Sequence, residues 1–425
     1  MLDLKFIRQN KELIQNAILV KRLNLNLENL FSLDAKVLDL KKKLQSLEEA
    51  KNINAKKVPL ADKLKLDKKE LIENGRIINQ QIEELKSKLQ LLEEELQQLL
   101  FLVPNIPSNK APIGATENDN LEIKRCGKPK TFNFTPLDHV AILEQNNWAE
   151  LERVSKVSGS RSYSLTNDMV LFEMAVIRFA LEKMQNKGFK LITVPALARE
   201  FAFFGTGHFP SAKEQAYFIP SDNLYLTGTA EVVLNALHTG EMLQEQDLPI
   251  LYAGFSPCFR REAGSSGKDT RGLIRVHQFY KVEQFVITKN DEQESYNWHQ
   301  KLLEISEEIV MDLELPYRVV DVCTGDMGAG KVRQFDIEAW VPSEQLYRET
   351  HSCSSLHDWQ ARRIDLRYRG SDGKVKYCHT LNNTAVATPR IIVPLLENHQ
   401  NIDGSINIPV KLQPFLNGKS LLGKK

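Results

Sequence analysis

The segment FSPCFRREAGSSGKDTRGLIRVHQFYKVE, residues 255–283, places a polar, glycine-rich stretch between two apolar runs. Aromatic and β-branched residues recur in residues 252–262 and 276–287, which is typical of β-strands. Residues 263–275 between them carry three glycines among Ser, Lys, Asp and Thr, which is typical of a loop. The segment therefore predicts an antiparallel hairpin with a long loop.

Charged residues gather on one predicted face of this hairpin. With the period of two that strands follow, Arg260 and Glu262 share a face of the first strand. On the second strand Glu283 shares a face with Phe279 and Lys281. A face with charges on both strands is unlike an apolar core. The hairpin is therefore either a solvated surface element or part of a polar site.

Composition limits the classes of protein to consider. The chain has 425 residues, enough for two or three domains, and its net charge of +1 means that any contact with nucleic acid must be local. The five cysteines form no CxxC pair and have no histidines at zinc spacing, which favours free thiols in a reducing compartment. No apolar run approaches the roughly 20 residues of a membrane span, and the N-terminus lacks an apolar signal segment. We therefore expect a cytoplasmic protein with no membrane partner.

The N-terminal part carries two heptad seams. Their members alternate at spacings of four and three: Leu33, Val37, Leu40, Leu44 and Leu47, then Ile78, Ile82, Leu85, Leu89, Leu92, Leu96 and Leu99. Pro59 between the two runs stops the first helix and lets the chain reverse. The pattern predicts an antiparallel coiled-coil arm over about residues 27–100, with its tip near residues 58–67 and a length of roughly 40–50 Å.

The purpose of such an arm is open from the residues alone. Leucine heptads most often mean a dimerisation coiled coil or a helical bundle packed on a core. A second interpretation is an arm that grips RNA, because lysines cluster toward the tip half: Lys41, Lys42, Lys43, Lys51, Lys56, Lys57, Lys63, Lys65, Lys68 and Lys69. Acidic residues are interspersed among them, so charge alone does not decide between the two.

Proline and glycine mark the predicted domain boundaries. Two prolines close the second arm helix, and residues 105–130 are rich in Pro, Asn, Gly and Lys. We therefore expect an N-terminal helical domain over residues 1–104, a linker over residues 105–130, and a larger domain over residues 131–425.

The string GDMGAGKV, residues 325–332, nearly spells a phosphate-binding P-loop. A P-loop needs Ser or Thr after its lysine to hold magnesium and must open a helix. Here Val332 follows the lysine, and a strand is predicted from that residue on. We interpret the string as a glycine-rich turn between strands.

Three segments resemble class II aminoacyl-tRNA synthetases. Phe259-Arg260-Arg261-Glu262 resembles motif 2, whose core is Phe-Arg-x-Glu, and the longer string AGSSGKDTRGLIRVHQF is similar to seryl-tRNA synthetases of bacterial type in particular. A helix over residues 171–185, a strand over 189–194 and Pro195 resemble motif 1, which builds the dimer interface in that class. HTLNNTAVATPR, residues 379–390, resembles motif 3 without the glycines that many bacterial members carry.

The resemblance implies an α+β fold. It consists of an antiparallel-sheet class II synthetase catalytic domain with an N-terminal α-helical antiparallel coiled-coil arm, in a homodimer. In this family the arm recognises the long variable arm of the tRNA.

The turn LTGTAE, residues 226–231, opens a predicted helix. Thr229 stands at its N-cap and Glu231 in its first turn, and capping alone would explain both residues. The resemblance implies instead that they contact the ammonium group of serine. It assigns to the serine-binding site Thr229, Ala230, Glu231, Glu283, Asn382 and Thr384. Within this set, Glu283 and Thr384 are expected to hold the serine hydroxyl.

The resemblance also implies an ATP-binding site. Its residues are Arg260, Arg261, Glu262, Arg275, Val276, Phe279, Glu349, Thr350, His351, Ser352 and Arg390. Arg260 and Arg390 are the expected catalytic cations, and Glu349 and Ser352 the expected ligands of Mg²⁺, which prefers oxygen donors. His351 departs from the serine of many bacterial members.

The implied activity is that of a serine–tRNA ligase. Its substrates are L-serine, ATP and tRNA(Ser), together with tRNA(Sec) where an organism has it. Two alternatives stay open: a synthetase paralogue that keeps the fold but not tRNA charging, and a coiled-coil scaffold protein. Serine-dependent ATP–pyrophosphate exchange, measured beside tRNA charging, separates all three.

Overall fold

The computed structural model describes residues 1–264 and 271–423. Residues 265–270 of the predicted hairpin loop lie outside this description. The chain divides into a helical unit, Leu2–Ile18 with Leu23–Val103, and a catalytic unit, which comprises Met1, Leu19–Arg22 and Pro104–Lys425. Among the described residues, no helix combines the length and the apolar character needed to cross a membrane.

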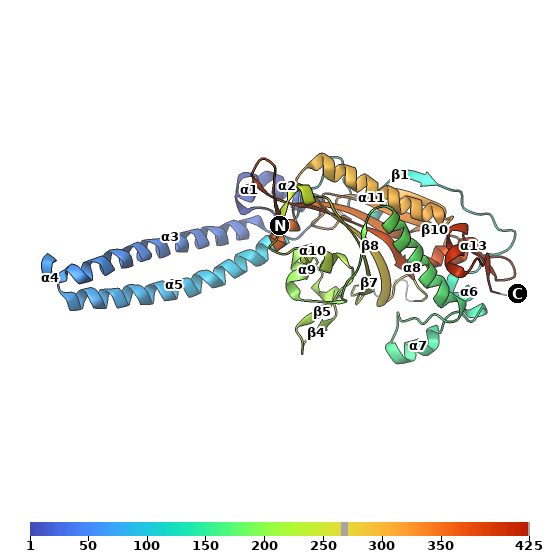
Figure 1. The fold of residues 1–425 in the computed structure, drawn as a ribbon, viewed down its shortest axis with the longest axis horizontal. Coiled ribbons are helices and arrows are strands. Elements are labelled where there is room, and N and C mark those ends of the chain that lie inside the picture. The colour runs from blue at the N-terminus through green and yellow to red at the C-terminus, as the bar shows by residue number, and fades with distance from the viewer. Residues whose placement is uncertain (265–270, 424–425) are drawn as a thin grey trace. The chain divides into compact units, whose positions relative to one another are not determined.

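Two long antiparallel helices dominate the helical unit. After α1 (Leu4–Gln9) and α2 (Lys11–Val20), α3 (Leu27–Lys57) and α5 (Lys68–Leu102) lie side by side, with the short α4 (Ala61–Leu64) at their tip (Figure 1). The predicted seam residues are all buried or half-buried, Val37 and Leu89 among the buried ones. Asp67 caps α5 by accepting from the backbone N–H groups of Lys69 and Glu70. The predicted coiled-coil arm is therefore confirmed.

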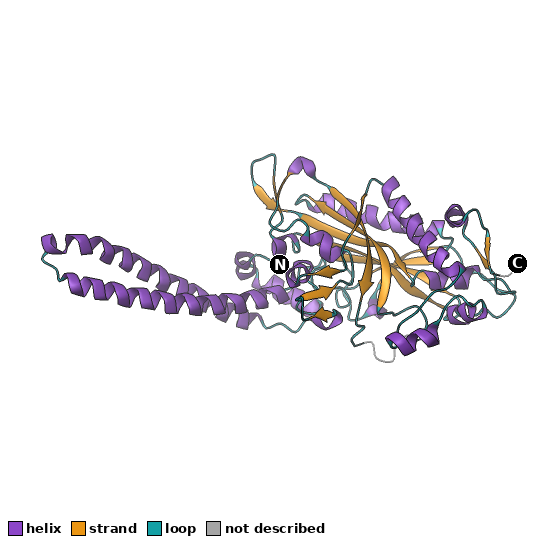
Figure 2. Ribbon diagram, turned by 60° about the horizontal axis from the view of Figure 1, so that its bottom comes forward, coloured by secondary structure: helices purple, strands orange, loops and turns teal. Residues whose placement is uncertain are grey.

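A mixed but mainly antiparallel sheet forms the centre of the catalytic unit (Figure 2). Its strand order is β1 (Leu121–Cys126), β9 (Tyr317–Asp321), β10 (Arg333–Val341), β11 (Leu346–His357), β14 (His379–Thr388), β8 (Gln278–Thr288), β7 (Ile250–Phe259) and β2 (Lys190–Thr193). Every neighbouring pair is antiparallel except β2 with β7. The predicted antiparallel-sheet core is confirmed, and the glycine-rich turn at residues 325–332 joins β9 to β10.

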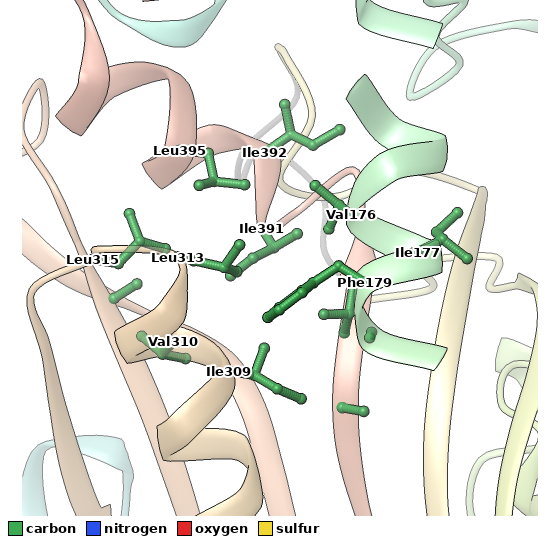
Figure 3. Close-up of a cluster of buried hydrophobic side chains, with 14 of the residues drawn as sticks. Val176, Ile177, Phe179, Ile309, Val310, Leu313, Leu315, Ile391, Ile392 and Leu395 are labelled. Atoms are coloured by element: carbon green, nitrogen blue, oxygen red, sulfur yellow. The ribbon is translucent and has the colours of Figure 1, made fainter. Parts of the chain in front are cut away.

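Three of the helices that form the larger apolar core pack closely on the central sheet. They are α8 (Asp168–Asn186), α11 (Glu292–Asp312) and α13 (Ile392–His399), and Figure 3 shows Phe179, Ile309 and Ile391 meeting there. On β8, Val282 and Val286 belong to this core. Because side chains alternate along a strand, Glu283 between them points to the opposite side of the sheet. That opposite side carries the candidate site.

Shorter helices and strands complete the catalytic unit, and some of them pack over the second apolar core. The helices are α6 (His139–Gln145), α7 (Leu151–Ser158), α9 (Glu200–Thr206), α10 (Glu231–Ala236) and α12 (Ala361–Ile364). The short strands are β3 (Leu197–Ala198), β4 (Phe218–Ile219), β5 (Leu224–Leu226), β6 (Met242–Gln244), β12 (Arg367–Arg369), β13 (Val375–Tyr377), β15 (Ile406–Asn407) and β16 (Leu421–Leu422). Phe285 and Ile287 of β8 pack in this second core with residues of α9, α10 and α12.

Two details of the predicted organisation need correction. Residues 105–130 are not only a linker, because β1 lies within them and pairs with β9 at the edge of the sheet. A charged edge strand looks like a linker by composition, since its side chains are mostly exposed. The first strand of the hairpin also ends earlier than predicted, at Phe259, and Glu262 has φ 51°. Arg260 and Glu262 are therefore placed by a turn, not by strand alternation.

Candidate active site

A cavity of about 400 Å³ lies over the sheet face opposite α8 and α11. Strands β8, β11 and β14, the turn after β7 and the loop before β10 contribute its walls. It brings together most of the residues predicted for the site: Thr229, Glu231, Arg260, Glu262, Arg275, Val276, Phe279, Glu283, Glu349, Thr350, Ser352, Asn382, Thr384 and Arg390. Residues from positions 229 to 390 thus line one hollow.

Two buried carboxylates belong to the predicted serine-binding end of this cavity. Glu231 accepts hydrogen bonds from Gln360 Nε2 at 2.7 Å and from Asn382 Nδ2 at 2.9 Å, both to Oε1. Glu283 forms an ion pair with Lys281, and both side chains are almost fully buried. Burial raises the pKa of both Glu231 and Glu283, and the charge of Lys281 opposes the rise in each case. Such an end suits a small ligand that carries an ammonium group and a hydroxyl.

The turn before α10 differs in one respect from the prediction. The N-cap of α10 is Ala230, which has no side-chain hydrogen bond, and not Thr229. Thr229 Oγ1 still accepts from the backbone N–H of Glu231 at 3.3 Å. The helix begins at Glu231, one residue later than expected, although Ala230 already has αR backbone angles.

Arginines and one aromatic ring form the predicted ATP-binding part. The guanidinium of Arg260 lies over the Phe279 ring, 5.2 Å from its centroid, and Nη2 donates to Gly228 O at 3.3 Å. Arg275 Nη1 lies 3.6 Å from Glu262 Oε2. This arrangement offers a flat stacking surface beside positive charge, which suits a purine nucleotide.

The third motif contributes Arg390, which lies just before α13. Its Nη1 lies 3.7 Å from Glu349 Oε1, and its Nε donates to Ile274 O at 3.3 Å. Burial lowers the pKa of Arg390, and the charge of Glu349 opposes this shift. The missing glycines of motif 3 therefore do not prevent this arginine from reaching the cavity.

The oxygen donors around Glu349 fit a magnesium ion. Ser352 Oγ accepts from Gln334 Nε2 at 3.1 Å, and the same amide donates to the buried Asp336 carboxylate at 2.9 Å. Burial, followed by the charge of Glu349, raises the pKa of Asp336 to about 7. Among the described residues, no group of three or more His, Cys, Asp or Glu could hold a metal. A hard cation here would thus depend on substrate and water oxygens as well, as Mg²⁺ commonly does.

Three predicted site residues do not line the cavity. Ala230 is buried, and Arg261 turns away to donate to Glu214 O at 3.4 Å. His351 is buried between Thr350 Oγ1 and Ala385 O, at 2.8 and 3.0 Å, and burial lowers its pKa to about 4. His351 alternates with Thr350 and Ser352 on β11, so it faces the core.

Sequence reasoning missed four polar residues that line the cavity or support it. Lys281 was visible on the charged strand face but was not assigned to the site. Lys331 lies in the glycine-rich turn at residues 325–332, and His208 lies just after the end of α9. Gln360 lines no wall but holds Glu231 in place. No motif marked the last two, because their proximity depends on the folded chain.

Comparison with known proteins agrees with this geometry. Residues 1–107 match the seryl-tRNA synthetase N-terminal domain, and residues 217–399 match the tRNA synthetase class II core domain (G, H, P, S and T). The serine–tRNA ligase of Deinococcus radiodurans is 51% identical over 424 residues, which cover 100% of this chain and 99% of that protein. The crystal structure of seryl-tRNA synthetase from Pyrococcus horikoshii complexed with ATP has a TM-score of 0.90 and 38% identity, with 100% of both chains covered. The cytoplasmic serine–tRNA ligase of Naegleria fowleri in complex with AMP has a TM-score of 0.85 and 28% identity, with 98% of this chain and 96% of that chain covered.

The antiparallel sheet and its cavity are those of a class II aminoacyl-tRNA synthetase. Sequence identity over the full length then identifies the family within this class. The chain belongs to the seryl-tRNA synthetase family, the serine–tRNA ligases.

Proposed function

We propose that this chain activates L-serine with ATP and transfers the seryl group to tRNA(Ser). In the first step a serine carboxylate oxygen attacks the α-phosphorus of ATP, which gives seryl-adenylate and releases pyrophosphate. In the second step a terminal ribose hydroxyl of the tRNA attacks the acyl carbon and releases AMP. The observation that carries the proposal is the single cavity in which buried carboxylates for an amino acid adjoin arginines and an aromatic ring for a nucleotide.

Charge explains the role proposed for Arg260 and Arg390. The first step brings a carboxylate to a polyphosphate, so cations must offset the negative charge that gathers on the phosphorus oxygens. Preorganised cations in a cavity that excludes water perform this task well, and positioning adds the rest of the rate gain. In this scheme Phe279 stacks on the adenine and Glu262 contacts its edge. No side-chain nucleophile is needed.

Selection of serine is proposed to depend on polar groups that would be left unpaired by other amino acids. Glu231 and Thr229 bind the ammonium group, with Asn382 holding Glu231 at 2.9 Å. Glu283 and Thr384 bind the hydroxyl. Alanine lacks that hydroxyl and would leave these buried groups without partners, which disfavours its binding strongly.

Magnesium is proposed to bind at Glu349 and Ser352. Bound there, it would offset charge on the ATP phosphates. The oxygen-only donor set and the buried Asp336 beside Ser352 support this assignment.

The arm is proposed to bind the tRNA. Residues 51–69 at its tip contain seven lysines and two acidic residues, and all seven lysines are exposed. None of the seven has a carboxylate within ion-pair distance in the described part of the chain. Exposed lysines of this kind can bind the phosphates of the tRNA backbone. tRNA(Sec) is a second substrate in this proposal where the cell contains it.

A homodimer in the cytoplasm completes the proposal. Four exposed apolar residues of α8 and β2 support a dimer surface on the motif 1 elements: Val170, Leu171, Met174 and Leu191. All five cysteines are free, which suits a reducing compartment.

Two assays test the function. ATP–pyrophosphate exchange that requires serine tests activation, and formation of seryl-tRNA(Ser) tests transfer. A paralogue that has lost charging would show the first reaction without the second. A scaffold protein would show neither, and that result would overturn the proposal.

A further inference from the structure

Residues 328–331, called here the 328–331 loop, form one wall of the activation cavity. The loop lies between β9 and β10, outside the sheet, and all four of its residues line the cavity. The sequence predicts a glycine-rich turn between strands here. Its position beside the proposed serine and ATP subsites raises the question of what the loop contacts.

Two buried polar residues of the catalytic unit hold the loop carbonyls. Lys21 Nζ donates to the carbonyls of Gly328 at 3.3 Å, Ala329 at 2.8 Å and Lys331 at 2.6 Å. Asn105 donates through its backbone N–H to Ala329 O at 2.9 Å and through Nδ2 to Gly330 O at 3.1 Å. Lys21 and Asn105 are 3% and 5% exposed. Each of the four consecutive carbonyls at residues 328–331 therefore accepts a hydrogen bond from Lys21 or Asn105.

Peptide geometry then fixes the direction of two N–H groups. In a trans peptide the C=O of one residue and the N–H of the next point in opposite directions. The carbonyls of Gly328 and Ala329 point toward the two anchors, so the N–H groups of Ala329 and Gly330 point away from them. Within the described residues, neither N–H has a hydrogen-bond acceptor. The loop thus presents two adjacent donors on the side opposite its anchors.

The charge of Lys331 adds to these donors. Of the cavity cations, Arg275 pairs with Glu262, Lys281 with Glu283, and Arg390 with Glu349. The ion pairs of the described residues give Lys331 no carboxylate; its Nζ donates to the neutral amide of Gln334 at 2.8 Å. Because its hydrogen-bond partner is neutral, the positive charge of Lys331 can pair with an anionic ligand.

From these observations we propose that the 328–331 loop is an anion-binding element of the activation cavity, built from the Ala329 and Gly330 N–H groups and the Lys331 ammonium. Lys21 and Asn105 are its positioning residues. The ligand is an anionic oxygen of a small substrate, supplied either by pyrophosphate or by the serine carboxylate. This inference rests on the proposed activation reaction.

Exchange kinetics with Lys331→Met test the proposal. The half-exposed side chain can be exchanged without opening the core, and a melting temperature within about two degrees of wild type confirms this. Loss of a charge-assisted contact raises the KM for its ligand by about tenfold or more. A rise in the KM for pyrophosphate identifies the phosphate source, and a rise in the KM for serine identifies the carboxylate. Unchanged KM values for both substrates overturn the proposal.

A second variant tests the positioning role. Lys21→Met removes the anchor of three loop carbonyls and is expected to raise the same KM as Lys331→Met, by a smaller factor. Arg22→Met is the matched control, because Arg22 is the neighbouring cation and, among the described residues, its guanidinium donates only to Ala115 O at 3.4 Å. An Arg22→Met enzyme with the same KM change as Lys21→Met contradicts the positioning role. Failure of the wild-type enzyme to show serine-dependent exchange would instead contradict the proposed function.

Discussion

Arg260 lies in the turn that follows β7, with its guanidinium over the Phe279 ring, while the next residue, Arg261, turns away from the cavity. Two adjacent arginines in opposite environments allow a sharp test. Arg260→Ala is expected to lower the rate of serine-dependent pyrophosphate exchange by about 10²–10³, the usual cost of a lost transition-state donor. The melting temperature should change little, because Arg260 is only half-buried.

Arg261→Ala is the matched control for this prediction. It removes the same charge one residue away, outside the cavity, and should leave exchange within a fewfold of wild type. Equal losses in the two variants would mean that general electrostatics, and not the position of Arg260, governs the rate.

Glu283 tests the serine subsite at the same scale. Glu283→Gln keeps the size of the side chain and removes its charge beside Lys281. We expect the KM for serine to rise by at least about tenfold while the KM for ATP stays within about twofold, because unpaired polar groups penalise the wrong partner strongly. Both constants come from the exchange assay. The opposite pattern, a higher KM for ATP alone, would remove Glu283 from the serine subsite.

The arm can be tested as one element because its seam is internal to α3 and α5. Replacing residues 33–100 with a short flexible linker leaves every cavity residue in place, since all of them lie after position 205. Serine-dependent exchange should therefore survive, and tRNA charging should fall steeply. If exchange is lost with charging, the arm supports the catalytic unit and the division into two functions is wrong.

The lysines at the tip allow a gentler version of this experiment. Changing the seven lysines of residues 51–69 to glutamine keeps the seam and removes the charge. We expect the KM for tRNA(Ser) to rise, and its dependence on salt to weaken, because each lost phosphate contact reduces the number of counterions released. As a control, changing Lys41 and Lys43, which pair with Glu93 and Asp39, should have a smaller effect.

At the scale of the whole molecule, buried histidines make the fold sensitive to acid. Burial lowers the pKa of His299 from 6.5 to about 4. Between these values the unfolded chain binds a proton that the folded chain does not, so the free energy of unfolding decreases as the pH falls from about 6.5 toward 4. This one residue contributes on the order of 1–3 kcal/mol to the loss.

Urea unfolding at several pH values between 4 and 7.5 measures this dependence. His299→Gln lacks the titrating group, so its free energy of unfolding should decrease less steeply over that range than the wild-type value. Identical slopes for the two proteins would show that His299 is protonated equally in the folded and unfolded states.

Local patterns were enough to predict several features of this protein. The heptad seam, the reversal near Pro59 and the hairpin strands depend on spacings of two or 3.6 residues, which are properties of the backbone and need no distant partner. The residues proposed for the serine and ATP subsites came instead from a resemblance to the class II synthetase motifs, because Phe-Arg-x-Glu and the motif 3 arginine are short, contiguous patterns. Of the assigned residues, most line the cavity.

Only the tertiary structure decided which distant residues meet. Lys21 bonds a loop more than 300 residues away in the chain, and Gln360 holds Glu231. These contacts depend on strand order and on where helices cross, which local spacing does not encode. The end of β7 at Phe259 likewise stops strand alternation before Glu262, and the pleat of β11 turns His351 into the core. Residue identity and local period therefore determined the kinds of elements, and short motifs indicated the proposed subsites, whereas long-range packing determined how the cavity is held together.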